Sequence, residues 1–308
     1  MFLKEFERVC AQAIVMSKFI KEKLFPILTV SVSIILLWYA FSIVLNSKWA
    51  YDKAVRADKV LSFKELVLDT WSQKKPKLPT PHQVFKEMNK TIFHKKITSK
   101  RSLVFHAWIT LSGTLAGFAL GTGLGIALAL AIVHNRATDL SVMPWVITSQ
   151  TIPILALAPM LIVALGGLGF TGLLPKAIIS MYLSFFPVVV GMVKGLRSPE
   201  ILELDQMKTW NASTFQILLR LRLPKSIPFL FTSLKLGIAA SVVGTIVGEL
   251  PVGAQGGLGS RMLAGSTFGQ PIQIWSALFT AAIMTALLIL IINLMKAVVF
   301  RTMSITEA

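Results

Sequence analysis

The sequence predicts an all-α membrane protein with six transmembrane helices. Hydrophobic residues make up 54 % of the 308 residues, and only 15 % are charged, against about 25 % in an ordinary soluble domain. Several uncharged segments reach the length of about 20 residues that a helix needs to cross the hydrocarbon layer. The formal charge of +17 mostly flanks these segments, so we do not expect a nucleic-acid-binding surface.

Six apolar segments are long enough to cross a bilayer. The first covers residues 26–45, and the second lies within 108–133. The third lies between Asp139 and Lys176 and is followed by a glycine-rich turn at 166–172. The last three cover 177–193, 227–250 and 271–295. We therefore expect an N-terminal segment (1–25), a first transmembrane helix (26–45), a basic linker (46–103), a five-helix core (104–301) and a tail (302–308).

The distribution of lysine and arginine predicts the orientation of the chain. Short loops rich in these residues remain on the cytoplasmic side. With a cytoplasmic N-terminus, the inner segments hold 14 of them, whereas the two short outer loops hold only Lys176 and Arg261. Six spans then place both termini in the cytoplasm and the linker 46–103 outside.

The linker 46–103 carries 14 basic and five acidic residues. Within it, residues 61–71 and 83–93 are expected to form short helices. Two interpretations remain open for this segment. It docks a partner, or it is a solvated linker held near anionic headgroups.

Small residues and prolines mark the inner spans. Gly113, Gly117, Gly121 and Gly125 recur every fourth residue and form a bare ridge, which predicts close packing of a neighbouring helix. Pro153 and Pro159 in the third span and Pro187 in the fourth are each expected to kink or interrupt their helix. Interrupted helices often line a path, so we hypothesise that Thr151, Pro153, Pro159 and Glu249 line a translocation route. The alternatives are a structural kink for the prolines and a helix-end hydrogen bond for Glu249.

Residues for catalysis or for ion coupling are scarce. Only Lys235 and Glu249 are charged within the spans, whereas secondary transporters commonly place several charges near the midplane. The four histidines lack metal-ligand spacing, and no phosphate-binding loop or nucleophile elbow occurs. We therefore expect a protein that is not an enzyme, holds no metal or cofactor, and takes its energy from elsewhere.

The inner loop 194–225 is predicted to form a helix, a sharp turn and a second helix. Ser198 is the expected N-cap of the first helix, which runs to about Trp210. Asn211 tolerates the left-handed conformation that ends helices. Ser213 and Gln216 match a capping box that starts the second helix, which is expected to end at Leu223 and Pro224.

Apolar side chains gather around this turn. Met207, Trp210 and Phe215 project from the loop, and exposed large apolar residues often mark an interface. The alternative, left open, is that these residues pack against the helix ends of this chain.

The segment from Glu200 to Pro224 resembles the cytoplasmic EAA loop of binding-protein-dependent ATP-binding-cassette (ABC) importer permeases. Alignment on Leu223 and Pro224 places Asp205 at the acid of that pattern, Gln206 and Met207 at the paired alanines, and Asn211 at the glycine. Three other segments resemble the nitrate, sulfonate, taurine and bicarbonate branch of this family: 78–81 (LPTP), 152–159 (IPILALAP) and 257–259 (GLG).

The resemblance implies a type I permease of the bacterial inner membrane. It implies a second permease chain, most simply a homodimer, an ATPase subunit that uses ATP, and an extracytoplasmic solute-binding protein that delivers a small anionic or heterocyclic solute. It places the ATPase on the elbow formed by Asp205, Gln206, Met207, Trp210, Asn211, Ala212, Ser213, Phe215 and Pro224. The alternatives are an ion-coupled secondary transporter and a membrane scaffold or assembly protein.

Overall fold

The computed structural model describes residues 25–58, 60–251 and 256–303. Within these ranges all regular elements are helices. Five helices are long and apolar enough to cross a membrane, and a bent pair of shorter helices brings the number to six. The predicted fold class is confirmed. The expected N-terminal segment and most of the C-terminal tail lie outside the described residues.

The chain divides into two compact units. The first contains the residues up to Glu87 together with Gly269–Ile272, and the second contains Met88–Phe268 and the residues from Gln273 onward. The boundary falls within the predicted linker. Each unit is described on its own below.

The first unit is built on α2 (Phe25–Arg56), which extends 11 residues beyond the predicted first span. Most of the large apolar side chains of α2 are exposed, as expected for a helix whose surface faces lipid. The linker then folds back on α2 at Asn46, a buried residue whose Oδ1 accepts from Lys77 N at 2.7 Å and whose Nδ2 donates to Leu78 O at 2.9 Å. The two predicted linker helices are confirmed as α3 (Phe63–Ser72) and α4 (Pro81–Phe93).

Three helices form the centre of the second unit: α5 (Leu103–His134), α8 (Leu173–Leu196) and α11 (Leu223–Glu249). The predicted glycine ridge of α5 is buried against α8. A Cβ atom built on Gly117 would lie 2.3 Å from Ser180 Cβ, and one on Gly121 would lie 2.1 Å from Ser184 Oγ. We call these three helices the α5–α8–α11 core.

The third predicted span is a bent pair of helices. α6 (Arg136–Ser149) and α7 (Ile154–Gly167) meet at an angle of 99°. Pro153 lies at the break as the N-cap of α7, as its missing N–H predicts, whereas Pro159 lies inside α7. The predicted interruption of the third span at Pro153 is therefore confirmed, and the interruption is a sharp bend between two separate helices.

Two further boundaries differ from the prediction. α8 begins at Leu173, so Lys176 is a buried residue in its first turn and not part of an outer loop. The helix that enters the fifth span does not turn at Leu223 and Pro224. α10 (Thr214–Ile217) continues through a π-helix, η2 (Leu218–Arg222), into α11. The wider π turn accommodates Pro224, which has no N–H to donate.

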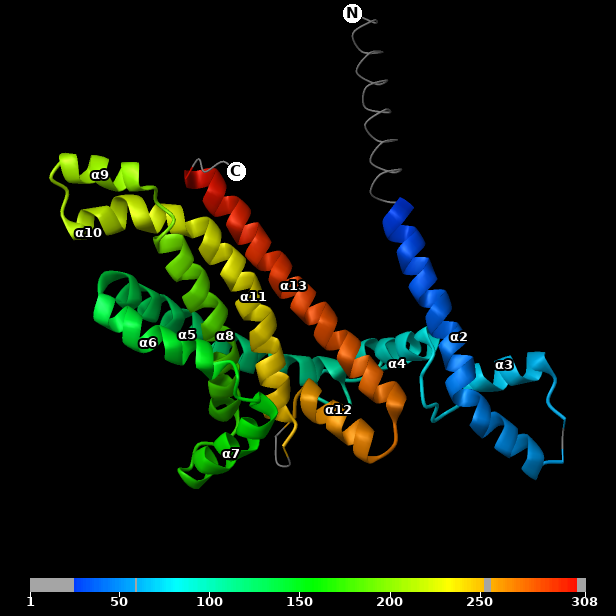
Figure 1. Cartoon of the computed structure of the whole chain (residues 1–308). Helices are drawn as coiled ribbons and strands as arrows, with labels where there is room; N and C mark the ends of the chain where they lie inside the picture. Colours follow the sequence, from blue (N-terminus) through cyan, green and yellow to red (C-terminus); the bar gives the residue numbers. More distant parts are fainter. Residues whose placement is uncertain (1–24, 59, 252–255, 304–308) are drawn as a thin grey trace, which may run out of the picture. The chain divides into compact units, whose positions relative to one another are not determined.

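The remaining helices define two ends of the second unit. α9 (Ile201–Thr209) and α10 lie at the end where α13 (Pro271–Met303) finishes, as Figure 1 shows. The contact between the rings of Phe231, near the start of α11, and Phe300 supports this placement. α12 (Leu258–Thr267) and α7 lie toward the opposite end. We call the first the elbow end and the second the α12 end.

Candidate functional site

The first arm of the elbow is α9. Its N-cap is Glu200, whose N–H donates to Glu203 Oε2 at 2.9 Å in a capping box. The prediction of Ser198 as this N-cap is wrong by two residues. Ser198 Oγ instead donates to Gly195 O at 2.8 Å and so finishes α8.

The turn of the elbow has the structure that its residues predict. Asn211 has a φ of 53°, the left-handed conformation predicted for it. Its N–H donates to Lys208 O at 2.8 Å, and Ala212 N donates to Met207 O at 3.0 Å. Ser213 N donates to Gln216 Oε1 at 2.8 Å, while Gln216 N donates to Ser213 Oγ at 3.3 Å. The predicted capping box is confirmed, and it starts the second arm directly after the turn.

Two large aromatic side chains of the elbow are left uncovered by the other residues that the structure describes. Trp210 is 74 % exposed and Phe215 is 66 % exposed. Asp205, Gln206, Asn211 and Ser213 are also exposed, whereas Met207, Ala212 and Pro224 are half-buried. Trp210 and Phe215 therefore do not pack against the helix ends of this chain, which was the alternative left open by the sequence. Such an exposed apolar pair is typical of an interface.

One ion pair links the elbow to α11, and a second joins the end of α8, just before the elbow, to α6. Lys225 at the start of α11 pairs with Glu203 on α9. Arg197 Nη2 at the end of α8 lies 2.7 Å from Asp139 Oδ2 on α6. The contact with the Lys225 ammonium lowers the pKa of the Glu203 carboxyl, and the hydrogen bond from Glu200 N lowers it further. The position of α9 therefore depends on an ionised Glu203.

We expect the Glu203 contact to give the elbow an acid-sensitive attachment. Because its pKa is lower in the folded protein, its stabilising effect is complete above the ordinary glutamate pKa of about 4.3 and is lost as pH falls below it. Glu203→Gln should therefore lower the melting temperature at neutral pH and make no difference in strong acid. Melting of both proteins in detergent from pH 7 to pH 3 measures this. A difference that persists unchanged to pH 3 contradicts the prediction, and Lys225→Gln should reproduce the loss.

The residues hypothesised to line a path do not form one group. Thr151 and Pro153 lie at the break between α6 and α7, and Pro159 is the sixth residue of α7. Glu249 is fully buried, and its carboxylate accepts hydrogen bonds from Thr110 Oγ1 and Gly259 N. Glu249 therefore makes hydrogen bonds at a helix end, which was the alternative to a role in lining the path. Thr110 is not predictable as a site residue from the sequence, because nothing local marks a threonine as the partner of a residue 139 positions away.

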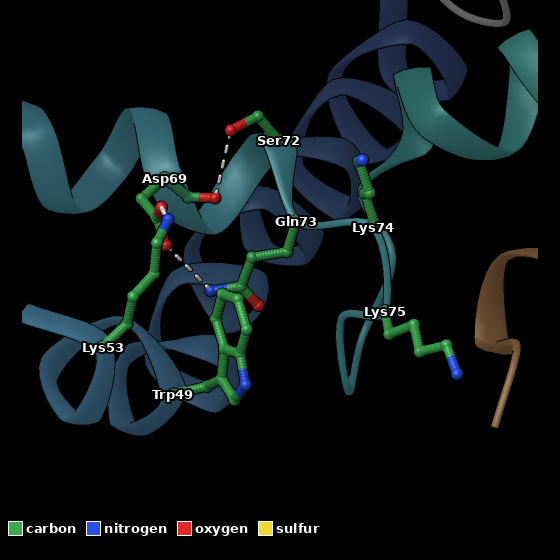
Figure 2. Close-up of a pocket in the computed structure, with 7 residues that line it drawn as sticks. All are labelled: Trp49, Lys53, Asp69, Ser72, Gln73, Lys74 and Lys75. Atoms are coloured by element: carbon green, nitrogen blue, oxygen red, sulfur yellow. Dashed lines mark hydrogen bonds and ion pairs between the residues drawn. The ribbon is translucent and has the colours of Figure 1, made fainter. Parts of the chain in front are cut away.

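The first unit contains a hollow of about 520 Å³ lined by Trp49, Lys53, Asp69, Ser72, Gln73, Lys74 and Lys75. Lys53 Nζ lies 2.7 Å from Asp69 Oδ1, so its charge is already paired. Figure 2 shows the Lys74 and Lys75 side chains extending away from Trp49 and Lys53. Because the ammonium groups do not converge, we assign no anion site here.

Comparison with known proteins identifies the chain. A family model described as "Binding-protein-dependent transport system inner membrane component" matches residues 121–305, which include the elbow, the bent pair and the α12 end. The chain belongs to this family. The resemblance stated from the sequence is thereby confirmed, and the protein is a multi-pass permease subunit of an ABC importer and not an enzyme.

Relatives of this permease share its central part. It is 31 % identical over 183 residues to a probable ABC transporter permease protein of Haemophilus influenzae, covering 59 % of this chain and 72 % of the relative. It is 33 % identical over 183 residues to the formylaminopyrimidine transport permease protein ThiX of Halalkalibacterium halodurans, with 59 % and 68 % covered. It is 30 % identical over 199 residues to the riboflavin transport system permease protein RibX of Chloroflexus aurantiacus, with 64 % and 71 % covered.

Proposed function

We propose that this permease forms the translocation path for a small solute that an extracytoplasmic binding protein delivers. A separate ATPase subunit drives transport by docking on the elbow, at the residues between Asp205 and Phe215 named above and at Pro224, and the chain itself binds no cofactor. A second copy of the chain completes the path. The protein lies in a bacterial inner membrane with both termini in the cytoplasm.

The uncovered apolar pair on the elbow carries the docking proposal. Trp210 and Phe215 are exposed on two short arms whose geometry is fixed by the capping box and by the Glu203–Lys225 pair. A preformed arm with exposed aromatic residues suits an interface, because aromatic anchors supply much of the binding free energy and a rigid arm loses little entropy on binding. The permeases of this family work with an ATPase, which is the partner expected at such a surface.

The basic residues at the elbow end support the cytoplasmic orientation. Arg136 is the first residue of α6, whose first turn is joined to the end of α8 by the Asp139–Arg197 pair, and Arg301 follows Phe300, whose ring contacts Phe231 of α11. Both arginines therefore belong to the same end as the elbow loop. Short cytoplasmic loops are enriched in lysine and arginine. Placing the elbow end inside puts the α12 end on the side where a solute-binding protein would arrive.

The solute class is inferred from relatives. ThiX is named for formylaminopyrimidine transport and RibX for riboflavin transport, which are both nitrogen heterocycles. From these names, and from the nitrate and sulfonate branch that the sequence resembles, we propose a small heterocyclic or anionic solute. Among the described lysine, arginine, aspartate and glutamate residues, only Lys176 and Glu249 are buried, and they lie beside each other. So few buried charges suit a path that leaves most of the selectivity to the binding protein.

Substitution of Trp210 tests the docking surface. Trp210→Glu places a charge where an apolar anchor is expected, so co-purification of the ATPase subunit should fall by more than about tenfold, the cost of losing a central aromatic residue. Ala212→Glu should act in the same way. Pull-down of the ATPase subunit from detergent extracts measures both effects.

The matched control is Phe268→Glu, because Phe268 is also an exposed aromatic residue of this unit but follows α12. It should leave co-purification unchanged. Normal co-purification of Trp210→Glu would refute the docking surface. In proteoliposomes, uptake that requires ATP supports the importer, whereas uptake driven by an ion gradient alone supports a secondary transporter, and absence of uptake with all subunits present supports a scaffold.

A further inference from the structure

The first backbone N–H groups of α12 are capped by side chains from two other helices. Gly257 N donates to His106 Nδ1 at 3.1 Å, and Leu258 N donates to Thr110 Oγ1 at 2.8 Å. Gly259 N donates to Glu249 Oε2 at 2.9 Å. The first N–H groups of a helix have no partner within that helix. Here three of them are bound by α5 and by the last residue of α11.

Glu249 is the centre of this arrangement. Its side chain is fully buried, and Thr110 Oγ1 lies 3.0 Å from Oε1 and 2.9 Å from Oε2. Lys176 Nζ lies 3.8 Å from Oε1 and donates to Gly256 O at 2.9 Å. The negative end of this pair lies at the N-terminus of α12, where the helix dipole favours an anion. Four elements, namely α5, α8, α11 and α12, therefore meet at one carboxylate.

The hydrogen bonds of His106 fit the same arrangement. Its Nδ1 accepts from Gly257 N, so in the neutral ring the proton is on Nε2, which lies 2.9 Å from Lys100 O. The ring thus joins the turn before α12 to the segment before α5. Along with Thr110, it attaches two successive residues of the α12 start to one face of α5.

The helices that carry these side chains are packed too closely to move separately. A Cβ on Gly244 would lie 2.8 Å from Ser180 Cα, so α11 and α8 touch at the backbone. Ser241 Oγ donates to Thr114 O at 2.8 Å, and Thr114 Oγ1 donates to Thr245 Oγ1 at 3.1 Å. Such interlocked helices move as one body. The elbow leaves this α5–α8–α11 core at the far end of the same two helices, α8 and α11.

We propose that Glu249 and Thr110 are positioning residues that fasten α12 to the α5–α8–α11 core, so that α12 moves with the elbow in each transport cycle. This inference rests on the proposed function. Without the fastening, the ATPase still docks and hydrolyses ATP, but its movement no longer reaches the α12 end, where the solute enters. Thr110 and Glu249 are needed for coupling and not for docking.

Three substitutions on α5 separate this role from a general effect on folding. Thr110→Val keeps the shape of the side chain but removes the hydroxyl that donates to Glu249 and accepts from Leu258 N. Thr110→Ser keeps that hydroxyl. Thr122→Val is the matched control, since Thr122 Oγ1 is buried and has no hydrogen-bond partner among the described residues. All three are assayed in the complete transporter in proteoliposomes.

Thr110→Val is expected to lower the solute taken up per ATP hydrolysed by at least about fivefold, the lower range of a typical coupling between sites. ATPase co-purification and ATP hydrolysis should stay within about twofold of wild type, since the elbow is unchanged. Hydrogen exchange at Leu258 and Gly259 should become faster. Thr110→Ser and Thr122→Val should match wild type in all three measurements.

Two results overturn the inference. One is a Thr110→Val transporter with normal uptake per ATP. The other is equal loss of coupling in Thr122→Val, which would assign the effect to any buried hydroxyl on α5. If Thr110→Val lowers the folded yield, Glu249→Gln gives the same comparison. Failure of the proposed function is distinguishable, because it appears as wild-type protein that does not retain the ATPase subunit.

Discussion

Gly117→Val is expected to prevent α5 and α8 from packing and to abolish the folded permease. A Cβ at this position would lie 2.3 Å from Ser180 Cβ, 2.4 Å from Ser180 Oγ and 2.7 Å from Ala177 O. The serine side chain is able to rotate, but the carbonyl belongs to the backbone of α8, so the helices must separate. Even modest overpacking costs about 1–3 kcal/mol, and in lipid the close contact is itself a main source of helix association.

Thermal melting followed by size-exclusion chromatography in detergent measures this effect. The matched control is Gly123→Val on the same helix, because a Cβ there has no atom within 4 Å. Gly117→Val should give little monodisperse protein, whereas Gly123→Val should melt close to wild type. Equal melting temperatures for the two variants would show that the ridge is not a packing surface.

Gly257→Ala is expected to abolish transport because it disturbs the start of α12, and not because it separates packed helices. Gly257 has a φ of 122° and a ψ of 168°, a conformation that is almost restricted to glycine and costs another residue about 1–3 kcal/mol. A Cβ would also lie 2.0–2.3 Å from the carboxyl atoms of Glu249. The alanine methyl group and the buried carboxylate therefore compete for the same space. Either the start of α12 moves away or Glu249 loses its hydrogen bonds.

ATP-driven uptake in proteoliposomes measures the consequence, and the folded yield is recorded alongside. Gly169→Ala is the control, because Gly169 also has a positive φ, 84°, but its Cβ would meet nothing within 4 Å. It bears the cost of backbone strain without a clash. If Gly169→Ala is as harmful as Gly257→Ala, strain alone explains the loss, and the contact with Glu249 has no part in it.

Local patterns predicted most of the fold. Uncharged runs marked the spans, and the glycine spacing marked the ridge that packs on α8. The expected capping box at Ser213 and the left-handed Asn211 both occur. These features depend on residues a few positions apart, and the physical preferences that decide them are readable within one turn of helix.

Errors arose where distant contacts decide the local structure. Lys176 was interpreted as the end of a span, because a charge in a sequence normally marks the membrane boundary. In the fold it is buried, since Gly256 O and Glu249 lie within its reach. Likewise, the partnership of Thr110 and His106 with the start of α12 joins residues about 150 positions apart. Hydropathy and helix propensity carry no signal for such pairs.

The bend between α6 and α7 determines which part of the second unit must be kept from contact with lipid. In the proposed orientation α6 starts at the cytoplasmic surface, and its 14 residues span about 21 Å at 1.5 Å per residue. The break at 150–153 then falls short of the far side of a hydrocarbon layer about 30 Å thick. Irregular backbone at that depth is stable only against protein or within an aqueous cavity. Ile152 is 47 % exposed in the isolated chain. In the assembled transporter, the break must therefore be sheltered from the acyl chains.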